Sequence, residues 1–435
     1  MNPTADDRFE WAKQAFLAGL AQMELGHLPE AQHHLEQSLA WMPGRTSTLV
    51  NLAAVRLGLN RADQALPLLE QACNLDPGNA QAWAYRGQAL KFLQQPAGAA
   101  ESLAQAVALQ PGNPVFWISL SEAQIVAGLA EPALASLDRL LALTPQNATA
   151  WSNRGMLLRE LQRPQQAAAS FEKAVALLAS AQASGQDGQL ALNQFYLAAA
   201  QAEPPERGAA ASAASTTGQP LQSMPPSAPR AYVEKLFDSY ATDFDAQLVQ
   251  GLQYRAPEIL LAGLRQRQAN LQFDRVLDLG CGSGLCGPLL RPAAHQLHGL
   301  DLSSVMLQKA GALGVYDQLF HADAVEHLQG STLRYNLVLA ADVLIYIGAL
   351  EALFAALVPR LAPGGQFVFT VEQLNEPSAA GVQLLPSLRY AHSEAYLRRL
   401  ATANGLVVDR LDGQTLRHEN GHALAGLFVY LRLLA

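Results

Sequence analysis

The sequence predicts two units of different fold class: an all-α helical-repeat solenoid, followed by an α/β unit built on a parallel sheet. Three observations support this division. In the first half, several residue types recur at a constant interval of 34 residues. A segment rich in proline, alanine and serine follows at 203–230. In the second half, a glycine-rich loop directly follows a buried strand, and acidic residues follow the next strands.

Composition is that of a globular chain and argues against some partners. The chain has 435 residues, of which 50% are hydrophobic and 15% charged, with a formal net charge of −8. A length about three times that of an average domain (roughly 150 residues) indicates two or more domains. Because lysine and arginine neutralise phosphates, an acidic chain without a basic run is not expected to bind nucleic acid. With no long apolar stretch and no secretory core, we expect no membrane span and a cytoplasmic location.

Four residue types keep the 34-residue interval in the first half. They are Pro43, Pro77, Pro111 and Pro145; Trp83, Trp117 and Trp151; Asn79, Asn113 and Asn147; and Ala31, Ala65, Ala99, Ala133 and Ala167. Within one period, apolar residues at helical spacing predict two helices, and a small residue on each lets them approach closely. The proline ends the second helix and turns the chain into the next period. A stack of helix pairs is therefore predicted.

This pattern resembles the tetratricopeptide repeat, with five repeats over about residues 12–181. A further helix at about 188–202 is expected to cap the open end, so the predicted first domain spans 1–202. The resemblance implies a concave groove for a protein or peptide, lined by the first helix of each repeat. By position, its lining is expected to be Phe16, Leu20, Val50, Leu57, Gln88, Ile118, Glu122, Ile125, Met156 and Arg159. Alternatively, this surface serves self-association or packing on the second domain.

Residues 203–230 are predicted to form a linker, since they contain six prolines and show no apolar periodicity. A flexible coil of this length has a root-mean-square span of roughly 30 Å. A substrate held by the repeats would therefore stay within reach of the second domain, predicted at 231–435.

The glycine-rich loop has the spacing Asp278-x-Gly280-x-Gly282-x-Gly284 and follows a buried strand. Three further predicted strands, at 297–302, 318–322 and 335–341, are followed or ended by Asp301, Asp323 and Asp342. Because the carboxyl ends of parallel strands meet at one edge of a sheet, we expect these acids near the loop. A dinucleotide fingerprint would need glycine at position 285, which is Leu285.

The loop and the acids that follow it resemble class I S-adenosylmethionine-dependent methyltransferases, over roughly 231–435. The resemblance implies a Rossmann-like, seven-stranded fold with S-adenosyl-L-methionine as cofactor. The whole chain resembles predicted bacterial methyltransferases that carry tetratricopeptide repeats. Closing stretches at 406–411 and 421–433 are expected to form the final hairpin, with its last strand antiparallel.

The resemblance also implies roles for individual residues. Glycines let the backbone approach the methionine part of the cofactor, while Asp278 orients the loop and the ammonium group. Asp301 accepts from both ribose hydroxyls, Met306 packs on the adenine, and Asp323 accepts from its amino group. The full expected set is Asp278, Gly280, Cys281, Gly282, Gly284, Asp301, Leu302, Met306, Asp323, Ala324, Ala340 and Tyr240. Ala340 and Asp342 are expected to border the transferring methyl group, and Tyr240 to lie over the cofactor.

Methyl transfer from a sulfonium depends mainly on alignment in a dry pocket, and it needs a general base only when the nucleophile must lose a proton. His392 is the candidate base, although a satisfied structural histidine is the alternative. Tyr346 is the second catalytic candidate, because it follows the fourth strand. Other polar residues expected near the acceptor are Glu372, Arg389, Tyr390, Arg417, His418 and Glu419. The histidines and three cysteines show no metal-ligand spacing, so no metal is expected.

We therefore predict a methyltransferase whose repeats recruit a protein partner or substrate. One alternative is a small-molecule O- or N-methyltransferase that uses the repeats only for complex assembly. Another is a non-catalytic adaptor that binds the cofactor structurally, and a third is other chemistry on the same fold. The sequence leaves the methyl acceptor and the oligomeric state open.

Overall fold

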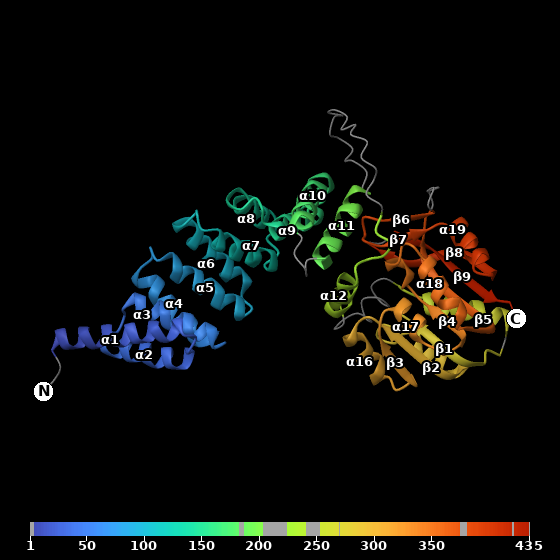
Figure 1. Cartoon of the computed structure of the whole chain (residues 1–435), viewed down its shortest axis with the longest axis horizontal. Helices are drawn as coiled ribbons and strands as arrows, with labels where there is room; N and C mark the ends of the chain where they lie inside the picture. The colour runs from blue at the N-terminus through green and yellow to red at the C-terminus, as the bar shows by residue number, and fades with distance from the viewer. Residues whose placement is uncertain are drawn as a thin grey trace, which may run out of the picture. The chain divides into compact units, whose positions relative to one another are not determined.

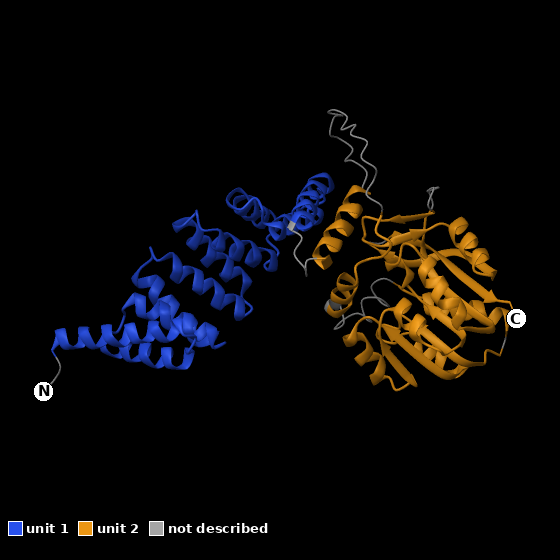
Figure 2. Cartoon of the chain, in the orientation of Figure 1, with its two compact units in different colours: residues 1–181 blue, residues 182–435 orange. Residues whose placement is uncertain are grey.

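A computed structural model of the chain describes residues 4–181, 187–202, 224–240, 253–268, 270–374, 381–419 and 422–434. The chain divides into two compact units, residues 1–181 and 182–435 (Figure 2). Among the described residues, no helix combines the length and the apolar character needed to cross a membrane.

The first unit is a run of helix pairs, as the 34-residue interval predicts (Figure 1). The pairs are α1 (Ala5–Glu24) with α2 (Leu28–Trp41), α3 (Thr46–Gly58) with α4 (Ala62–Leu75), α5 (Ala80–Phe92) with α6 (Pro96–Leu109), α7 (Pro114–Val126) with α8 (Ala130–Leu143), and α9 (Ala148–Glu160) with α10 (Pro164–Ala181). These pairs confirm the helical-repeat solenoid.

The recurring polar residues make the same contacts in successive repeats. Asn113 caps α7 by accepting from the backbone N–H of Val115 at 3.1 Å. The indole Nε1 of Trp117 donates to the carbonyl of Pro111 at 2.8 Å. The tryptophan contact recurs one repeat earlier and one later, from Trp83 to Pro77 and from Trp151 to Pro145. Asn79 and Asn147 also cap their helices, by accepting from the N–H three residues later. These residues therefore fix the junction between one repeat and the next.

Small residues let the two helices of each pair pack closely. The recurring alanines, from Ala31 to Ala167, are all 0% exposed. At Gly87, a Cβ atom would lie 2.6 Å from Cγ of Leu103, so a side chain would push the helices apart. The turns within each pair use a left-handed residue at the same repeat position: Gly26, Asn60, Gln94, Gly128 and Gln162.

The second unit is a sheet flanked by helices. Its strands are β1 (Phe273–Leu279), β2 (Ala294–Asp301), β3 (Gln318–His321), β4 (Tyr335–Ala340), β5 (Leu361–Gln373), β6 (Val382–Leu384), β7 (Tyr390–His392), β8 (Leu406–Glu419) and β9 (His422–Leu433). Its helices are α11 (Asp187–Gln201), α12 (Arg230–Tyr240), α14 (Ala256–Arg267), α15 (Gly287–Leu290), α16 (Ser304–Ala312), α17 (Ala324–Gly330), α18 (Glu351–Leu357) and α19 (Glu394–Ala403). Short 3₁₀ turns are η2 (Arg291–Ala293), η3 (Leu344–Tyr346) and η4 (Val358–Arg360).

The main sheet contains the predicted seven strands. Strands β3, β2, β1, β4 and β5 pair in this order and run parallel. Strand β9 pairs antiparallel with β5, and β8 pairs antiparallel with β9, which confirms the expected final hairpin. The short strands β6 and β7 add to the sheet at the carboxyl end of β5. Parallel order brings the carboxyl ends of β1, β2 and β4 to one edge.

Helix α11 belongs to the second unit, whereas we expected it to cap the solenoid. The ring of Phe195 lies 5.4 Å from that of Tyr232 and 6.2 Å from that of Tyr390, both in the second unit. The division into compact units falls after residue 181, whereas the predicted boundary is at residue 202. Apolar spacing shows that a helix has a face to bury, but it does not identify the surface that covers it.

Candidate functional site

The glycine-rich loop after β1 packs at both ends and is open in its middle. Gly280, Gly282 and Gly284 have φ angles of 69°, 54° and 95°, a region that favours glycine. A Cβ atom at Gly280 would lie 2.4 Å from Val343, and one at Gly284 would lie 2.7 Å from Leu313. At Gly282, a Cβ atom would meet no described protein atom within 4 Å. The loop therefore presents bare backbone at Gly282, where a ligand can approach.

Asp301, at the carboxyl end of β2, lies against this open part of the loop. Its Oδ2 accepts from the Gly282 N–H at 2.8 Å, and its Oδ1 accepts from the Ser303 N–H at 2.8 Å. Burial raises the pKa of Asp301, while the backbone N–H groups of Ser303 and Gly282 oppose that rise. Because each carboxylate oxygen can accept more than one hydrogen bond, Asp301 keeps acceptor capacity for a ligand.

Asp278 lies beneath the loop. Its side chain is 1% exposed, and its Oδ2 accepts from the Tyr316 hydroxyl at 2.6 Å. Burial raises the pKa of Asp278 to about 7, and hydrogen bonds from Tyr316 and from the Cys286 thiol oppose the rise. These contacts support a role in orienting the loop, while the predicted ammonium contact stays a prediction.

Three further predicted cofactor residues lie at this edge of the sheet: Leu302 just before α16, and Asp323 and Ala324 at the start of α17. Asp323 caps α17, because its Oδ1 accepts from the N–H groups of Val325 and Glu326 at 2.8 and 3.1 Å. Ala324 is the first residue of α17. The carbonyl of Leu302 lies 2.8 Å from Nε2 of His321, so it is occupied by a protein donor.

Several predicted cofactor residues are covered by protein. Met306 and Ala340 are 0% exposed, and Cys281 is 6% exposed. A cofactor contact by Met306 or Ala340 would therefore require the protein atoms that cover them to move. Cys281 packs in a small apolar cluster with Leu307, as expected for a structural cysteine. The side chain of Tyr240 lies outside the described residues.

A charged cluster lies beyond the carboxyl ends of β4 and β5, made of Asp342, Glu372, Arg389, Arg417 and Glu419. Nη1 of Arg417 donates to both carboxylate oxygens of Asp342, at 2.7 and 2.6 Å, and its Nη2 donates to Glu372 at 2.6 Å. Nε of Arg417 donates to Glu419 at 2.8 Å, and Nη2 of Arg389 donates to both oxygens of Glu419 at 2.6 Å. Three carboxylates thus share two guanidinium groups.

Asp342 connects this charged cluster to the glycine-rich loop. Its φ of 61° is unusual for a residue with a side chain, and its N–H donates to Oγ1 of Thr370 at 2.8 Å. The next residue, Val343, is the one that packs against Gly280. The charged cluster therefore borders the glycine-rich loop, on the side where a methyl acceptor is expected.

Tyr346 lies in the same loop after β4, as predicted. Its ring meets that of Phe237 edge-to-face at 5.6 Å. Burial raises its pKa, and the negative charge of Asp342 adds to the rise, so the phenol is neutral near neutral pH. Tyr346 can therefore donate a hydrogen bond to an acceptor but is a poor base.

His392 is not available as a base, so this prediction is corrected. It is 0% exposed, its Nε2 lies 3.0 Å from the Gly348 carbonyl, and its ring stacks on that of Tyr396. Burial lowers its pKa to about 4. A neutral, enclosed imidazole that donates to a backbone carbonyl has a structural role, the alternative recognised from the sequence.

A separate hollow of about 300 Å³ lies on the first unit. It is lined by Gln81, Ala84, Tyr85, Gln88, Lys91, Leu103, Val115, Phe116 and Ser119. Among these, Ala84, Gln88 and Lys91 occupy, in the third repeat, the repeat positions used to predict the groove. Nζ of Lys91 donates to Glu122 at 2.6 Å, so the charge at this rim is paired.

Two predicted groove residues, Val50 and Leu57, are instead core residues. They are 6% and 5% exposed. Both belong to apolar clusters against which Tyr85 packs, so the next repeat covers them. At the equivalent positions two repeats later, Ile118 and Ile125 are partly exposed. Met156, at another predicted groove position in the fifth repeat, is 38% exposed.

Comparison with protein families identifies both units. Residues 252–411 match the model of a methyltransferase domain. Residues 22–90 and 93–157 match a tetratricopeptide repeat model, and residues 148–177 match a second one. The chain joins tetratricopeptide repeats to a methyltransferase domain. The described helix pairs and the seven-stranded sheet agree with both assignments.

Several curated relatives that match the second half of the chain are named as methyltransferases or methyltransferase-like proteins. Human methyltransferase-like protein 27 is 41% identical over 19% of this chain and 34% of its own length. Malonyl-[acyl-carrier protein] O-methyltransferase of Enterobacter lignolyticus is 29% identical over 36% of this chain and 60% of its own length. Trans-aconitate 2-methyltransferase of Pseudomonas paraeruginosa is 35% identical over 21% and 34%. The chain thus spans between about a third and three fifths of these relatives.

Solved structures resemble each unit separately. MamA from Desulfovibrio magneticus aligns with 40% of this chain and 97% of its own length, at 19% identity and a TM-score of 0.37. The N-methyltransferase NodS from Bradyrhizobium japonicum, crystallised with S-adenosyl-L-homocysteine, aligns with 46% of this chain and 97% of its own length, at 16% identity and a TM-score of 0.37.

Some residues that organise the methyltransferase domain carried a sequence signal and others did not. Ser303 caps α16, accepting from the Met306 N–H at 3.1 Å, and its hydroxyl donates to Asp238 of α12 at 2.7 Å. A serine just before a helix is a recognisable cap signal, which could have identified Ser303. No local pattern points to Tyr316 or Thr370, because their partners lie far away in the sequence.

Proposed function

We propose that the methyltransferase domain binds S-adenosyl-L-methionine and methylates an acceptor held beside Asp342 and Tyr346. The observation that carries this proposal is the open backbone at Gly282 with the Asp301 carboxylate 2.8 Å from its N–H. A nucleoside with two ribose hydroxyls fits such a carboxylate, because charge-assisted hydrogen bonds are strong. When bound, this cofactor supplies an electrophilic methyl group on its sulfonium sulfur.

The chain's own residues would position the reactants. Gly280 and Gly284 hold the loop against Val343 and Leu313, and Asp301 would accept from the ribose. On the acceptor side, Tyr346 offers a hydroxyl and the charged cluster fixes Asp342. Alignment and exclusion of water are the main contributions that such a displacement needs. A carboxylate acceptor would need no base, which agrees with the enclosed position of His392.

We further propose that the repeats recruit a protein partner or substrate. The hollow between α5 and α7 supports this role, because it combines apolar side chains with the amides of Gln81 and Gln88. Side-chain amides can pair with the backbone of a bound peptide, and the exposed Val115 and partly exposed Tyr85 can pack on an apolar side chain. In this proposal the repeats supply affinity and the methyltransferase domain supplies chemistry.

A small-molecule O-methyltransferase is the second candidate. One curated relative is named for trans-aconitate, a small acid that carries carboxylates. In that case the repeats would serve only complex assembly. Incubation of the full chain with methyl-labelled cofactor and cell extract separates the candidates, since a labelled protein band supports the first and a labelled small acid the second. Cofactor binding with no transfer would support the third candidate, a structural use of the cofactor.

Asp301→Asn in the full chain tests the cofactor site. Loss of the carboxylate charge weakens two charge-assisted bonds to the ribose, so we expect calorimetric affinity for S-adenosyl-L-methionine to fall about 10–100-fold. Asp317→Asn is the matched control: Asp317 pairs with Arg291 at 2.7 Å and lies before β3, at the opposite edge of the sheet. Equal affinity of wild type and Asp301→Asn would reject the cofactor assignment.

A further inference from the structure

Helix α11 connects to the acceptor side of the methyltransferase domain through an aromatic cluster. The cluster consists of Phe195 and Tyr196 from α11, Tyr232 from α12 and Tyr390 from β7. Ring centroids lie 5.4 Å apart for Phe195 and Tyr232, 6.2 Å for Phe195 and Tyr390, and 6.1 Å for Tyr196 and Tyr232. Phe195 and Tyr390 are both 0% exposed. Rings at these distances interact directly, so α11 is held by packing and not only by chain connectivity.

Tyr390 carries this packing to the loop after β4. A Cβ atom at Gly348 would lie 2.6 Å from the Tyr390 ring, so the ring lies directly on the backbone there. The Tyr390 hydroxyl donates to the carbonyl of Pro225 at 2.7 Å. One side chain thus touches α11, the loop after β4 and the segment before α12.

The segment 225–229, here called the strap, pairs with the acceptor loop, residues 342–349. The N–H groups of Gly348 and Ala349 both donate to the carbonyl of Pro226 at 2.8 Å. In return, the Ala228 N–H donates to the carbonyl of Tyr346 at 2.9 Å, and Ser227 forms a bridge with Ile347. The backbone of Tyr346 is therefore fixed by the strap, while its ring meets Phe237 of α12.

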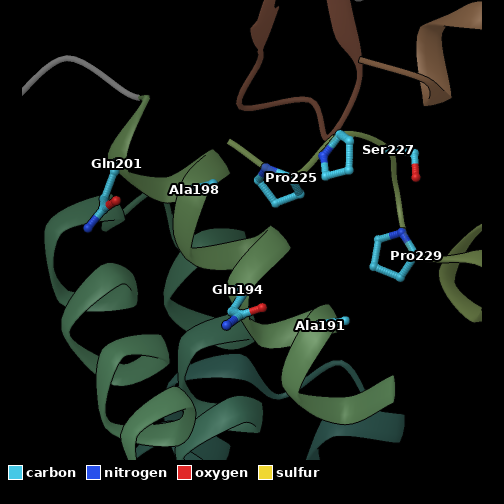
Figure 3. Close-up of a pocket in the computed structure, with 8 residues that line it drawn as sticks. Ala191, Gln194, Ala198, Gln201, Pro225, Ser227 and Pro229 are labelled. Atoms are coloured by element: carbon cyan, nitrogen blue, oxygen red, sulfur yellow. The ribbon is translucent and has the colours of Figure 1, made fainter. Parts of the chain in front are cut away.

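A hollow of about 660 Å³ separates another part of α11 from the strap (Figure 3). It is lined by Ala191, Gln194, Ala198, Gln201, Pro225, Pro226, Ser227 and Pro229. None of the predicted cofactor residues whose side chains the structure describes line it. Along this face α11 does not pack tightly on the strap, so its support for the acceptor loop runs through the aromatic cluster.

We propose that Phe195 and Tyr390 are positioning residues for the methyl-transfer reaction: they hold the acceptor loop, and with it Tyr346, through the strap. This inference rests on the proposed function, in which Tyr346 faces the methyl acceptor. It makes α11, the first described helix after the repeats, a working part of the methyltransferase domain. The separable repeat unit then ends at residue 181, and not after α11.

Amide hydrogen exchange on the full chain tests the proposal. Phe195→Ala should speed exchange at Ala228, Gly348 and Ala349 about tenfold or more, because a cavity beside Tyr390 frees the strap–loop pairing. The amides of Gly280 and Cys281, in the glycine-rich loop, both donate to the carbonyl of Leu300 in β2 and should keep their exchange rates. Phe195→Leu retains most of the apolar volume and keeps the fold, so it should show the same pattern with a smaller increase.

Phe171→Ala is the matched control, since Phe171 is 0% exposed in α10 of the repeat unit. It removes the same ring and should leave the acceptor loop unchanged. Unchanged exchange at Gly348 and Ala349 in both Phe195 variants would overturn the inference, and so would an equal increase at Gly280 and Cys281. Calorimetry tests the proposed function separately. If wild type does not bind S-adenosyl-L-methionine, the proposed function is rejected, while the exchange data still show whether Phe195 supports the acceptor loop.

Discussion

At the scale of single residues, Asp278 and His392 are buried ionisable groups whose charged forms the fold disfavours. Burial raises the pKa of Asp278 to about 7 and lowers the pKa of His392 to about 4. Both groups therefore couple stability to pH, but with opposite signs. Because their pH ranges overlap, the wild-type curve alone does not separate the two effects, and each needs its own variant.

Asp278→Asn should stabilise the methyltransferase domain at neutral and alkaline pH. In the unfolded chain Asp278 ionises near pH 3.8, whereas in the folded protein it holds its proton to about pH 7. Its contribution to stability is therefore full below pH 3.8 and is lost as pH rises to about 7. Asparagine removes this loss and can still accept from Tyr316. Denaturant unfolding at pH 8 should show a gain on the order of 3 kcal/mol, absent at pH 4.

His392→Gln should flatten the acid side of the stability curve. The unfolded imidazole takes up a proton below pH 6.5, but the folded protein resists protonation until about pH 4. The wild type therefore loses stability, on the order of 3 kcal/mol, as pH falls between these values. Glutamine can replace the bond to Gly348 and does not titrate. If the pH–rate profile of methyl transfer has an acid limb in the wild type that is absent in His392→Gln, the result would instead support a base role for His392.

At the scale of elements, the charged cluster joins β4, β5, β7 and β8. Arg417 is 2% exposed in its side chain and donates to Asp342, Glu372 and Glu419. Removing one partner of a buried ion pair leaves an uncompensated charge, whereas exposed pairs contribute little. The hairpin β8–β9 is therefore anchored to the acceptor loop mainly by one guanidinium.

Arg417→Met should destabilise the methyltransferase domain by about 3–5 kcal/mol, since it removes the cation paired with Asp342 and leaves the buried Glu372 with Arg389 alone. The matched control on the same hairpin is Arg432→Met. Arg432 is 35% exposed, and its partner Asp409 also pairs with Arg267 at 2.9 Å, so this loss should be much smaller. Denaturant midpoints of the two variants, measured in parallel, give the comparison. Equal losses would mean that the charged cluster contributes no more to stability than the more exposed ion pair of Arg432.

At the scale of the whole molecule, two units with separate cores should unfold in separate steps. Each unit has its own buried clusters, and contacts divide the chain after residue 181. Scanning calorimetry of the full chain should therefore resolve two transitions. Gly155→Ala should lower only the first unit's transition, because its Cβ would lie 2.6 Å from the Phe171 ring. A single transition that shifts as a whole would contradict this division.

Sequence reasoning predicted the elements that depend on local or periodic patterns. The repeats were predictable because each helix packs against neighbours in sequence, and Asp301 because strand ends meet at one edge. Contacts over long separations were not: Tyr316 reaches Asp278 across 38 positions, and Arg417, although expected near the acceptor, pairs with Asp342 across 75. Burial was the second source of error. Val50 and Leu57 are apolar, as a groove lining requires, and His392 has the side chain of a base, but neighbouring side chains cover all three.

The repeat junctions have one more consequence, for spectroscopy. All five tryptophans of the chain, Trp11, Trp41, Trp83, Trp117 and Trp151, lie in the repeat unit. Three of them hold a proline carbonyl through their indole nitrogen. Indole fluorescence of the intact protein therefore reports on the solenoid alone. A ligand of the repeats should change this fluorescence and a ligand of the sheet edge should not, so the unlabelled protein distinguishes the two.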